Sequence, residues 1–306
     1  MRNMRRITFS RLAGGDEAAL HLHEVIGERG AGPTIGISAA VHGDEFVGTQ
    51  ILMAMMRRLK DSDLRGRLLL LPVANPYSFE ARTRHNPIDD LNLNRVFPGM
   101  AGGWFSEQLA HTIVQEVLGR VVVLIDLHAG GARPTVDYVY IFNDEKLSRS
   151  FGSKLLYRPD SRNPGTVYGG TLTGLAVERG IPSVTLELGG GAIDQAPYVA
   201  RGADGLANAL RALGALPGEP HMRDDQIVLS RIDIFRPTEG GFLRTEAPPL
   251  GERIEEGAVL GRVFSPYTFG ELEVMRNSLP NGWMVLAHLS ENLVQPGDYA
   301  YMVGCE

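Results

Sequence analysis

The sequence predicts an α/β protein with a mostly parallel central sheet flanked by helices, followed by a small β domain. Over the first two-thirds of the chain, short apolar runs alternate with longer helical patterns, which is typical of a parallel sheet with crossover helices. The run at residues 121–125 has no polar face, so we expect it at the centre of the sheet, covered on both sides. After about Pro220 no helical period remains, and Gly and Pro separate short β-like segments.

The individual elements follow from the same patterns. Strands are expected at residues 19–25, 34–39, 67–73, 121–126, 138–142 and 183–188, and helices at 45–59, 104–118, 170–178 and 199–213. Residues 75–103 show neither period and are rich in Pro, Asn, Asp and Gly, and a loop of that length in a compact domain is usually functional or disordered. Near residues 218–226 the helical periodicity gives way to short β-like segments separated by Gly and Pro. We therefore expect an α/β domain over 1–220 and a small β domain over 221–306.

Composition narrows the functional classes. With 306 residues, 43% of them hydrophobic and 22% charged, the chain lies in the globular range, which excludes disordered, collagen-like and disulfide-stapled proteins. A net charge of −6 argues against a nucleic-acid partner, because phosphate contacts need a basic surface. No stretch of about 18 apolar residues occurs, so we expect neither a signal peptide nor a membrane span. The single cysteine, Cys305, fits a reducing cytoplasm.

His42 and Glu45 stand in the run Ala-Val-His-Gly-Asp-Glu, directly after the strand expected at 34–39. Open α/β sheets bind ligands at the carboxyl ends of their parallel strands. An imidazole and a carboxylate three residues apart can face one ion across a turn, and both are ligands of Zn²⁺. Alternatively, Glu45 favours the dipole of a helix N-terminus and His42 is a loop residue. The pattern alone leaves both interpretations open.

Two further polar residues follow other expected strands. His128 comes after the apolar run at 121–125, where a lone histidine is more often a hydrogen-bonded core residue than a ligand. Asp126, two residues earlier, points to the same side of the strand and can orient the imidazole of a ligand. Glu187 lies within an apolar strand, where burial raises the pKa of a carboxyl toward the range of a general base. The alternative for Glu187 is a solvated position at the sheet margin. Two His and one Glu leave the fourth position of a zinc ion open, as catalysis requires.

The long loop supplies arginines, among them Arg84 and Arg95, together with Asn94. Arginine can bind a carboxylate through two parallel hydrogen bonds or stabilise an oxyanion. The chain has only three lysines, so any single arginine could equally be a solvated surface residue.

Four ordered motifs resemble those of the succinylglutamate desuccinylase/aspartoacylase family, within the zinc carboxypeptidase-like clan. They are HGDE at 42–45, the loop NP…TR…NLNRVFPG from 75 to 99, DLHAGG at 126–131 and TLELGG at 185–190, and the resemblance spans about residues 34–215. The run ELGGG and the loop spacing are most similar to the bacterial N-acyl amino acid deacylases of that family.

The resemblance implies a zinc carboxypeptidase-like sheet, a C-terminal β-barrel-like domain that often narrows the entrance to the site, and one Zn²⁺ per chain. The implied roles are zinc ligation by His42, Glu45 and His128, activation of water by Glu187, carbonyl polarisation by Arg84, and carboxylate binding by Asn94 and Arg95.

The resulting hypothesis is a cytoplasmic zinc-dependent hydrolase that removes the acyl group from a small N-acyl amino acid or diamino acid, as a deacetylase or desuccinylase does. No nucleic-acid or membrane partner is expected, and a homo-oligomer is left open. A metallocarboxypeptidase is the alternative, because the same zinc, base and arginines would serve peptide cleavage. A non-catalytic ligand-binding relative is the third candidate, which the presence of all three ligands and the base disfavours.

Overall fold

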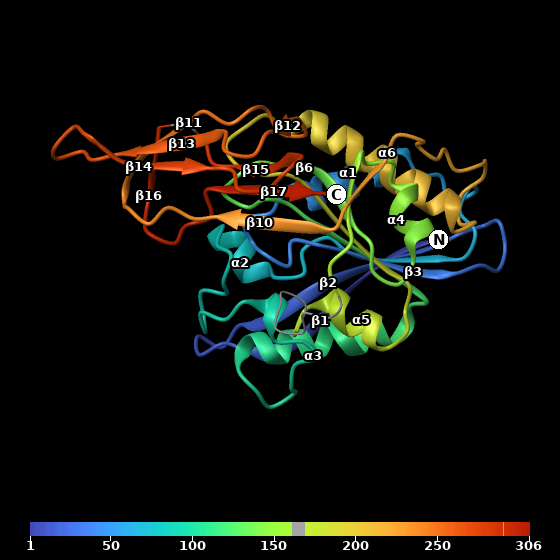
Figure 1. Cartoon of the computed structure of the whole chain (residues 1–306). Coiled ribbons are helices and arrows are strands. Elements are labelled where there is room, and N and C mark those ends of the chain that lie inside the picture. The colour runs from blue at the N-terminus through green and yellow to red at the C-terminus, as the bar shows by residue number, and fades with distance from the viewer. Residues whose placement is uncertain (161–168, 290) are drawn as a thin grey trace.

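The computed structural model describes residues 1–160, 169–289 and 291–306, and a large mixed sheet is its main feature (Figure 1). The strand order is β1-β2-β4-β3-β5-β8-β6-β15-β17-β10. The first part of the chain contributes β1 (Arg2–Arg11), β2 (Glu17–Ile26), β3 (Thr34–Ala39), β4 (Arg67–Leu71), β5 (Val123–His128), β6 (Thr135–Tyr140), β7 (Leu155–Tyr157) and β8 (Ser183–Gly189).

Parallel pairing lies at the centre of this sheet. β3 pairs parallel with both β4 and β5, and β5 pairs parallel with β8. Every residue of β5 is buried, as expected of an apolar run between two other strands, although the strand begins two residues later than predicted. Towards both margins the pairing becomes antiparallel, with β2 against β4 and β6 against β8. The sheet is therefore mixed overall, and the parallel strands form its core.

Helices cover both faces of the sheet (Figure 1). They are α1 (Val47–Arg58), α2 (Pro76–Ala81), α3 (Phe105–Glu116), α4 (Glu145–Ser150), α5 (Leu172–Glu178) and α6 (Ala196–Ala212), with short 3₁₀ turns at Leu93–Arg95 and Leu118–Arg120. Leu68 and Leu70 of β4 pack in the cluster that contains α1 and α6, whereas Leu69 and Leu71 pack in the cluster that contains α3 and α5. This alternation follows from the two-residue period of a strand.

Helices α1 and α6 pack closely on one face because α6 carries small residues there. A side chain at Gly202 would place its Cβ 2.3 Å from Cδ1 of Ile51.

The helices predicted from the sequence agree with α1, α3, α5 and α6 to within three residues at each end. Across the described parts of the chain, none of the helices is both long and apolar enough to cross a membrane.

Four elements of the first part of the chain were not expected from the sequence, namely β1, β7, α2 and α4. β1 forms the edge of the sheet, antiparallel to β2, although its sequence is dominated by arginine. Those arginines form ion pairs across the surface, such as Arg5 with Glu116 and Arg6 with Glu17. The predicted long loop contains the short helix α2, whose start is marked by the side chain of Asn75 accepting a hydrogen bond from the amide of Ser78 and by Pro76 at its first position.

The C-terminal part of the chain is all β among the residues described. Its strands are β9 (Ile227–Leu229), β10 (Arg231–Phe235), β11 (Gly241–Thr245), β12 (Arg253–Ile254), β13 (Val259–Phe264), β14 (Glu271–Arg276), β15 (Gly282–Ala287), β16 (Asn292–Val294) and β17 (Tyr301–Cys305). A small antiparallel sheet has the order β14-β13-β11-β16, as expected of a C-terminal β unit. However, β15, β17 and β10 extend the main sheet beyond β6. The predicted division at residue 220 stays a prediction.

Candidate metal centre and active site

Three neighbouring strands bring the predicted site residues to one edge of the sheet. His42 and Glu45 lie in the turn between β3 and α1, and His128 is the last residue of β5. Glu187 lies near the end of β8, where it pairs in register with His128. Because β3, β5 and β8 are parallel neighbours, their carboxyl ends meet, which is why residues far apart in the sequence share one site.

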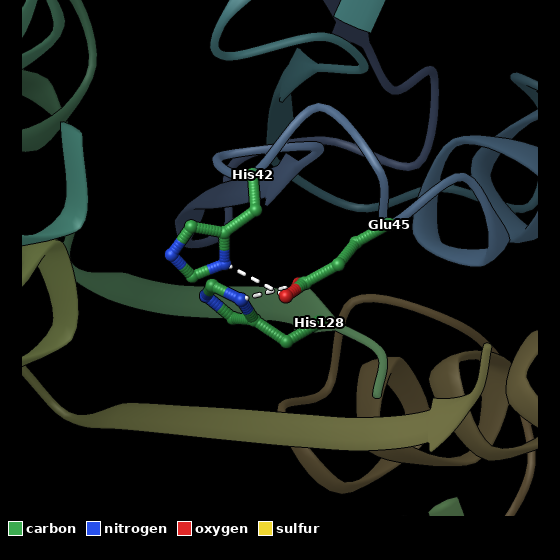
Figure 2. Close-up of side chains that lie close together, drawn as sticks. All are labelled: His42, Glu45 and His128. Carbon is green, nitrogen blue, oxygen red and sulfur yellow. Dashed lines mark hydrogen bonds and ion pairs between the residues drawn. The ribbon is translucent and has the colours of Figure 1, made fainter. Parts of the chain in front are cut away.

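His42, Glu45 and His128 form a compact buried group (Figure 2). Nδ1 of His42 lies 2.8 Å from Oε1 of Glu45, and Nδ1 of His128 lies 2.8 Å from Oε2 of Glu45. Each of the three residues is at most 3% exposed, and their ligand atoms lie within 4.8 Å of one another. The group can hold a metal ion.

The far sides of both imidazole rings face oxygen atoms. Nε2 of His128 lies 3.0 Å from Oδ2 of Asp126, and Nε2 of His42 lies 3.2 Å from Oδ1 of Asn92. That atom of Asn92 also accepts a hydrogen bond from the amide of Asn94, which identifies it as the oxygen. Metal-binding histidines typically donate their other N–H in this way, so that the ligating nitrogen keeps its lone pair.

The proton count at His42 supports a cation in this group. Burial lowers the pKa of His42, so its ring is neutral and carries one proton. Two oxygen atoms, from Glu45 and Asn92, nevertheless face its two nitrogens, so one of these contacts lacks a proton. A cation between Nδ1 and the carboxylate removes that conflict. The donor set of two imidazoles and one carboxylate matches catalytic zinc sites.

His128 and Glu45 have opposite electrostatic environments. Burial alone would lower the pKa of His128, but Asp126 and Glu45 together raise it well above its usual range. Burial alone would raise the pKa of Glu45, yet the two imidazoles hold it well below its usual range. The group therefore keeps Glu45 as a carboxylate, and positive charge beside it is favoured, either as a proton on His128 or as a metal ion.

Glu187 lies beside this group and lines the same cavity. Burial raises the pKa of Glu187 to about 8, although the nearby His128 acts in the opposite direction. A carboxyl with such a pKa can accept and return a proton near neutral pH, as a general base requires.

The long loop places the predicted polar residues around the cavity, whose volume is about 450 Å³. Arg84 donates from Nη1 to Oε1 of Glu45 at 3.2 Å, and its side chain is about half exposed. Arg95 is an exposed residue, yet partial desolvation of its charge and the nearby charge of Arg84 lower its pKa. Asn94 uses its amide oxygen to accept from the backbone of Leu172, which leaves its Nδ2 group as the donor available to a substrate.

Sequence reasoning missed several residues of the site. Ser38 donates to Oδ1 of Asp126 at 2.6 Å, and Thr173 lies 3.4 Å from Oδ2 of Asp126. Arg133 lines the cavity, and its Nε is buried with no hydrogen-bond partner among the described residues. Asn92 could have been suspected from its place in the Asn-Leu-Asn-Arg motif, whereas no local pattern distinguishes Ser38 or Thr173 from ordinary core residues.

Comparisons with known proteins identify the family of this chain. The family model of the succinylglutamate desuccinylase/aspartoacylase catalytic domain matches residues 31–213. The N-alpha-acetyl-L-2,4-diaminobutyric acid deacetylase of Halomonas elongata is 31% identical over 248 residues, which cover 78% of this chain and 72% of the relative.

Solved structures show the same fold. A succinylglutamate desuccinylase from a Silicibacter species is 28% identical, with a TM-score of 0.84 over 99% of this chain and 94% of that one. The product-bound ectoine utilization protein EutE (DoeB) from Ruegeria pomeroyi is 25% identical, with a TM-score of 0.87 over 100% of this chain and 95% of that one. The family match covers more than half of the chain and includes all three residues of the buried group. This chain therefore belongs to the succinylglutamate desuccinylase/aspartoacylase family and to its deacylase branch, whose members hydrolyse amide bonds.

Proposed function

We propose that this protein is a zinc-dependent deacylase that hydrolyses the amide bond of a small N-acyl amino acid or diamino acid, with one Zn²⁺ per chain. The observation that carries the proposal is the convergence of two Nδ1 atoms and a carboxylate beside Glu187, a carboxyl with a pKa of about 8. The activity of the Halomonas relative, a deacetylase of an N-acetyl diamino acid, supports the same substrate class.

His42, Glu45 and His128 would hold the ion, and Asp126 would fix the ring of His128. Zn²⁺, when bound, supplies positive charge that acidifies water and polarises a carbonyl. Glu187 accepts the proton of the attacking water and returns it to the leaving amine. Arg84 stabilises negative charge as it develops on the carbonyl oxygen. Asn94 and Arg95 hold the carboxylate of the substrate, Arg95 through its two-pronged guanidinium.

Metal analysis combined with two variants tests this proposal. Protein purified without added metal should contain about one zinc per chain, and removal by a chelator should abolish release of free amine from N-acyl amino acids. Glu187→Gln should retain zinc but lose activity by about 10²- to 10⁴-fold, the usual contribution of a general base. Glu45→Gln is the matched control and should lose the metal itself. Hydrolysis that persists in metal-free protein would refute the mechanism.

A further inference from the structure

The C-terminal strands build an apolar side of the cavity, which we call the apolar wall and define as Ile232, Ile234, Leu286 and Met302. Cross-strand registers place these side chains together. Ile234 of β10 pairs with Met302 of β17, and Met302 pairs with Leu286 of β15. Ile232, two residues before Ile234, points to the same side of its strand. The wall therefore lies on the adjacent strands β15, β17 and β10, which extend the main sheet beyond β6 (Figure 1).

The apolar wall leads directly to the predicted base. Leu286 pairs with Thr135 of β6, and Thr135 pairs with Gly189 of β8. Further along the same two strands, Tyr138 pairs with Glu187. A substrate whose amide bond lies at Glu187 would thus have the wall within the same cavity, on the side away from His42 and Glu45.

The wall differs in chemistry from the rest of the cavity. None of the residues that β10, β15 and β17 contribute to the lining is charged, whereas the charged lining residues come from the loops and strands of the first part of the chain. Ile234 on the wall is 37% exposed, so part of this apolar surface is in contact with solvent. Apolar side chains that face a cavity beside a polar site favour a ligand with an apolar portion, because burying that portion removes both surfaces from water.

The position of Arg95 indicates which half of the substrate contacts the wall. Arg95 lines the same cavity as the wall, together with Tyr140 and Tyr299. Tyr299 lies three residues before Met302 in the chain. If Arg95 holds the carboxylate of the amino acid released, the side chain of that same amino acid is the group placed closest to the wall.

We propose, building on the deacylase function above, that the preferred substrates are N-acyl derivatives of amino acids with an apolar side chain, and that the apolar wall selects this side chain. An ammonium group at the same place would lose its hydration without gaining a partner on the wall. The acyl group, on the other side of the amide bond, would contribute little to selection.

The experiment compares kcat/KM of the zinc-loaded protein across two substrate series. The first keeps the acetyl group and varies the amino acid through alanine, norleucine, phenylalanine and 2,4-diaminobutyrate. Norleucine should exceed alanine by tenfold or more, since each added methylene in an apolar pocket is worth about tenfold or more, and diaminobutyrate should fall below norleucine by a larger factor. The second series keeps alanine and lengthens the acyl chain from acetyl to hexanoyl, and kcat/KM should change less than threefold.

Variants of the wall connect this preference to particular residues. Met302→Gln and Ile234→Asn should reduce the ratio of norleucine to alanine several-fold, whereas Met302→Leu should preserve it. Met222→Gln is the matched control, because Met222 is 37% exposed and does not line the cavity, and it should leave the ratio unchanged. Thermal unfolding of each variant shows that it is folded.

The outcomes separate the two proposals. Equal kcat/KM for norleucine and alanine, or preference for diaminobutyrate, would refute the apolar selection while leaving the deacylase function intact. Dependence on acyl length in place of side-chain length would refute the assignment to the amino-acid half. Absence of hydrolysis of every N-acyl amino acid by zinc-loaded protein would refute the proposed function itself.

Discussion

Asp126 is the residue through which the buried group is anchored to the core. It is 1% exposed and lies between Ser38 and His128, with one carboxylate oxygen on each. In Asp126→Asn, the new amide can donate to Nε2 of His128, which moves the ring proton to Nδ1 and blocks the lone pair that would bind metal. We therefore expect zinc affinity to fall by about 10- to 100-fold, measured by competition with a chromophoric chelator. Ser38→Ala serves as control, because it removes the hydrogen bond to Oδ1 but leaves the contact with His128, and it should cost less affinity. If Asp126→Asn binds zinc with wild-type affinity, the contact with Asp126 does not determine which ring nitrogen of His128 carries the proton.

At the scale of elements, the turn between β3 and α1 is held in place by contact with α2. Gly43 donates its amide hydrogen to the carbonyl of Thr83, and a Cβ on Gly43 would lie 1.9 Å from the carbonyl carbon of Ser78. Gly43→Ala must therefore move α2 or the turn, which displaces both His42 and the loop that carries Arg84. Overpacking of this kind typically costs about 1–3 kcal/mol, so we expect a lower melting temperature together with weaker zinc binding. Gly102→Ala, in the same long loop, meets no atom within 4 Å and should change neither quantity. Normal zinc affinity in a folded Gly43→Ala protein would contradict this account of the turn.

The same turn illustrates how much could be predicted from the sequence. The strand over residues 34–39 was predicted with the bounds that β3 has, because a short apolar run before a polar turn is a local signal. β3, β5 and β8 are each a short apolar run that leads into a polar turn. The sequence therefore also indicated that His42, His128 and Glu187 stand at strand ends. β1 was missed because an edge strand buries little of its surface, so its few half-buried residues, such as Ile7, stand among arginines. Helix α2 was missed because its six residues are too few for a periodic pattern, although Asn75-Pro76 is a recognisable helix start.

At the scale of the whole molecule, the contact between the two parts of the chain could not be predicted. The apolar wall depends on the registers of β6, β15, β17 and β10, and the β6–β15 contact joins residues 150 positions apart in the chain. The loss of helical periodicity near residue 220 indicates where the α/β pattern ends. It carries no information on which strand edge the following β segments cover. The sequence therefore identified the polar half of the cavity and left the apolar half unassigned.

The shared packing between these parts predicts how the protein unfolds. One hydrophobic cluster contains Tyr138 and Leu155 from the first part together with Leu229, Trp283 and Val285 from the second. β9 also pairs with β7, and β15 pairs with β6, so removing residues 221–306 would expose two strand edges and this cluster. We expect the full chain to unfold in a single calorimetric transition, with equal calorimetric and van't Hoff enthalpies. The fragment 1–220 should aggregate or lack a cooperative transition. As a control, shortening only the exposed hairpin tip around Tyr267, which is 89% exposed, should leave the transition in place. A fragment 1–220 that folds cooperatively and binds zinc would instead show that the predicted boundary separates two independent domains.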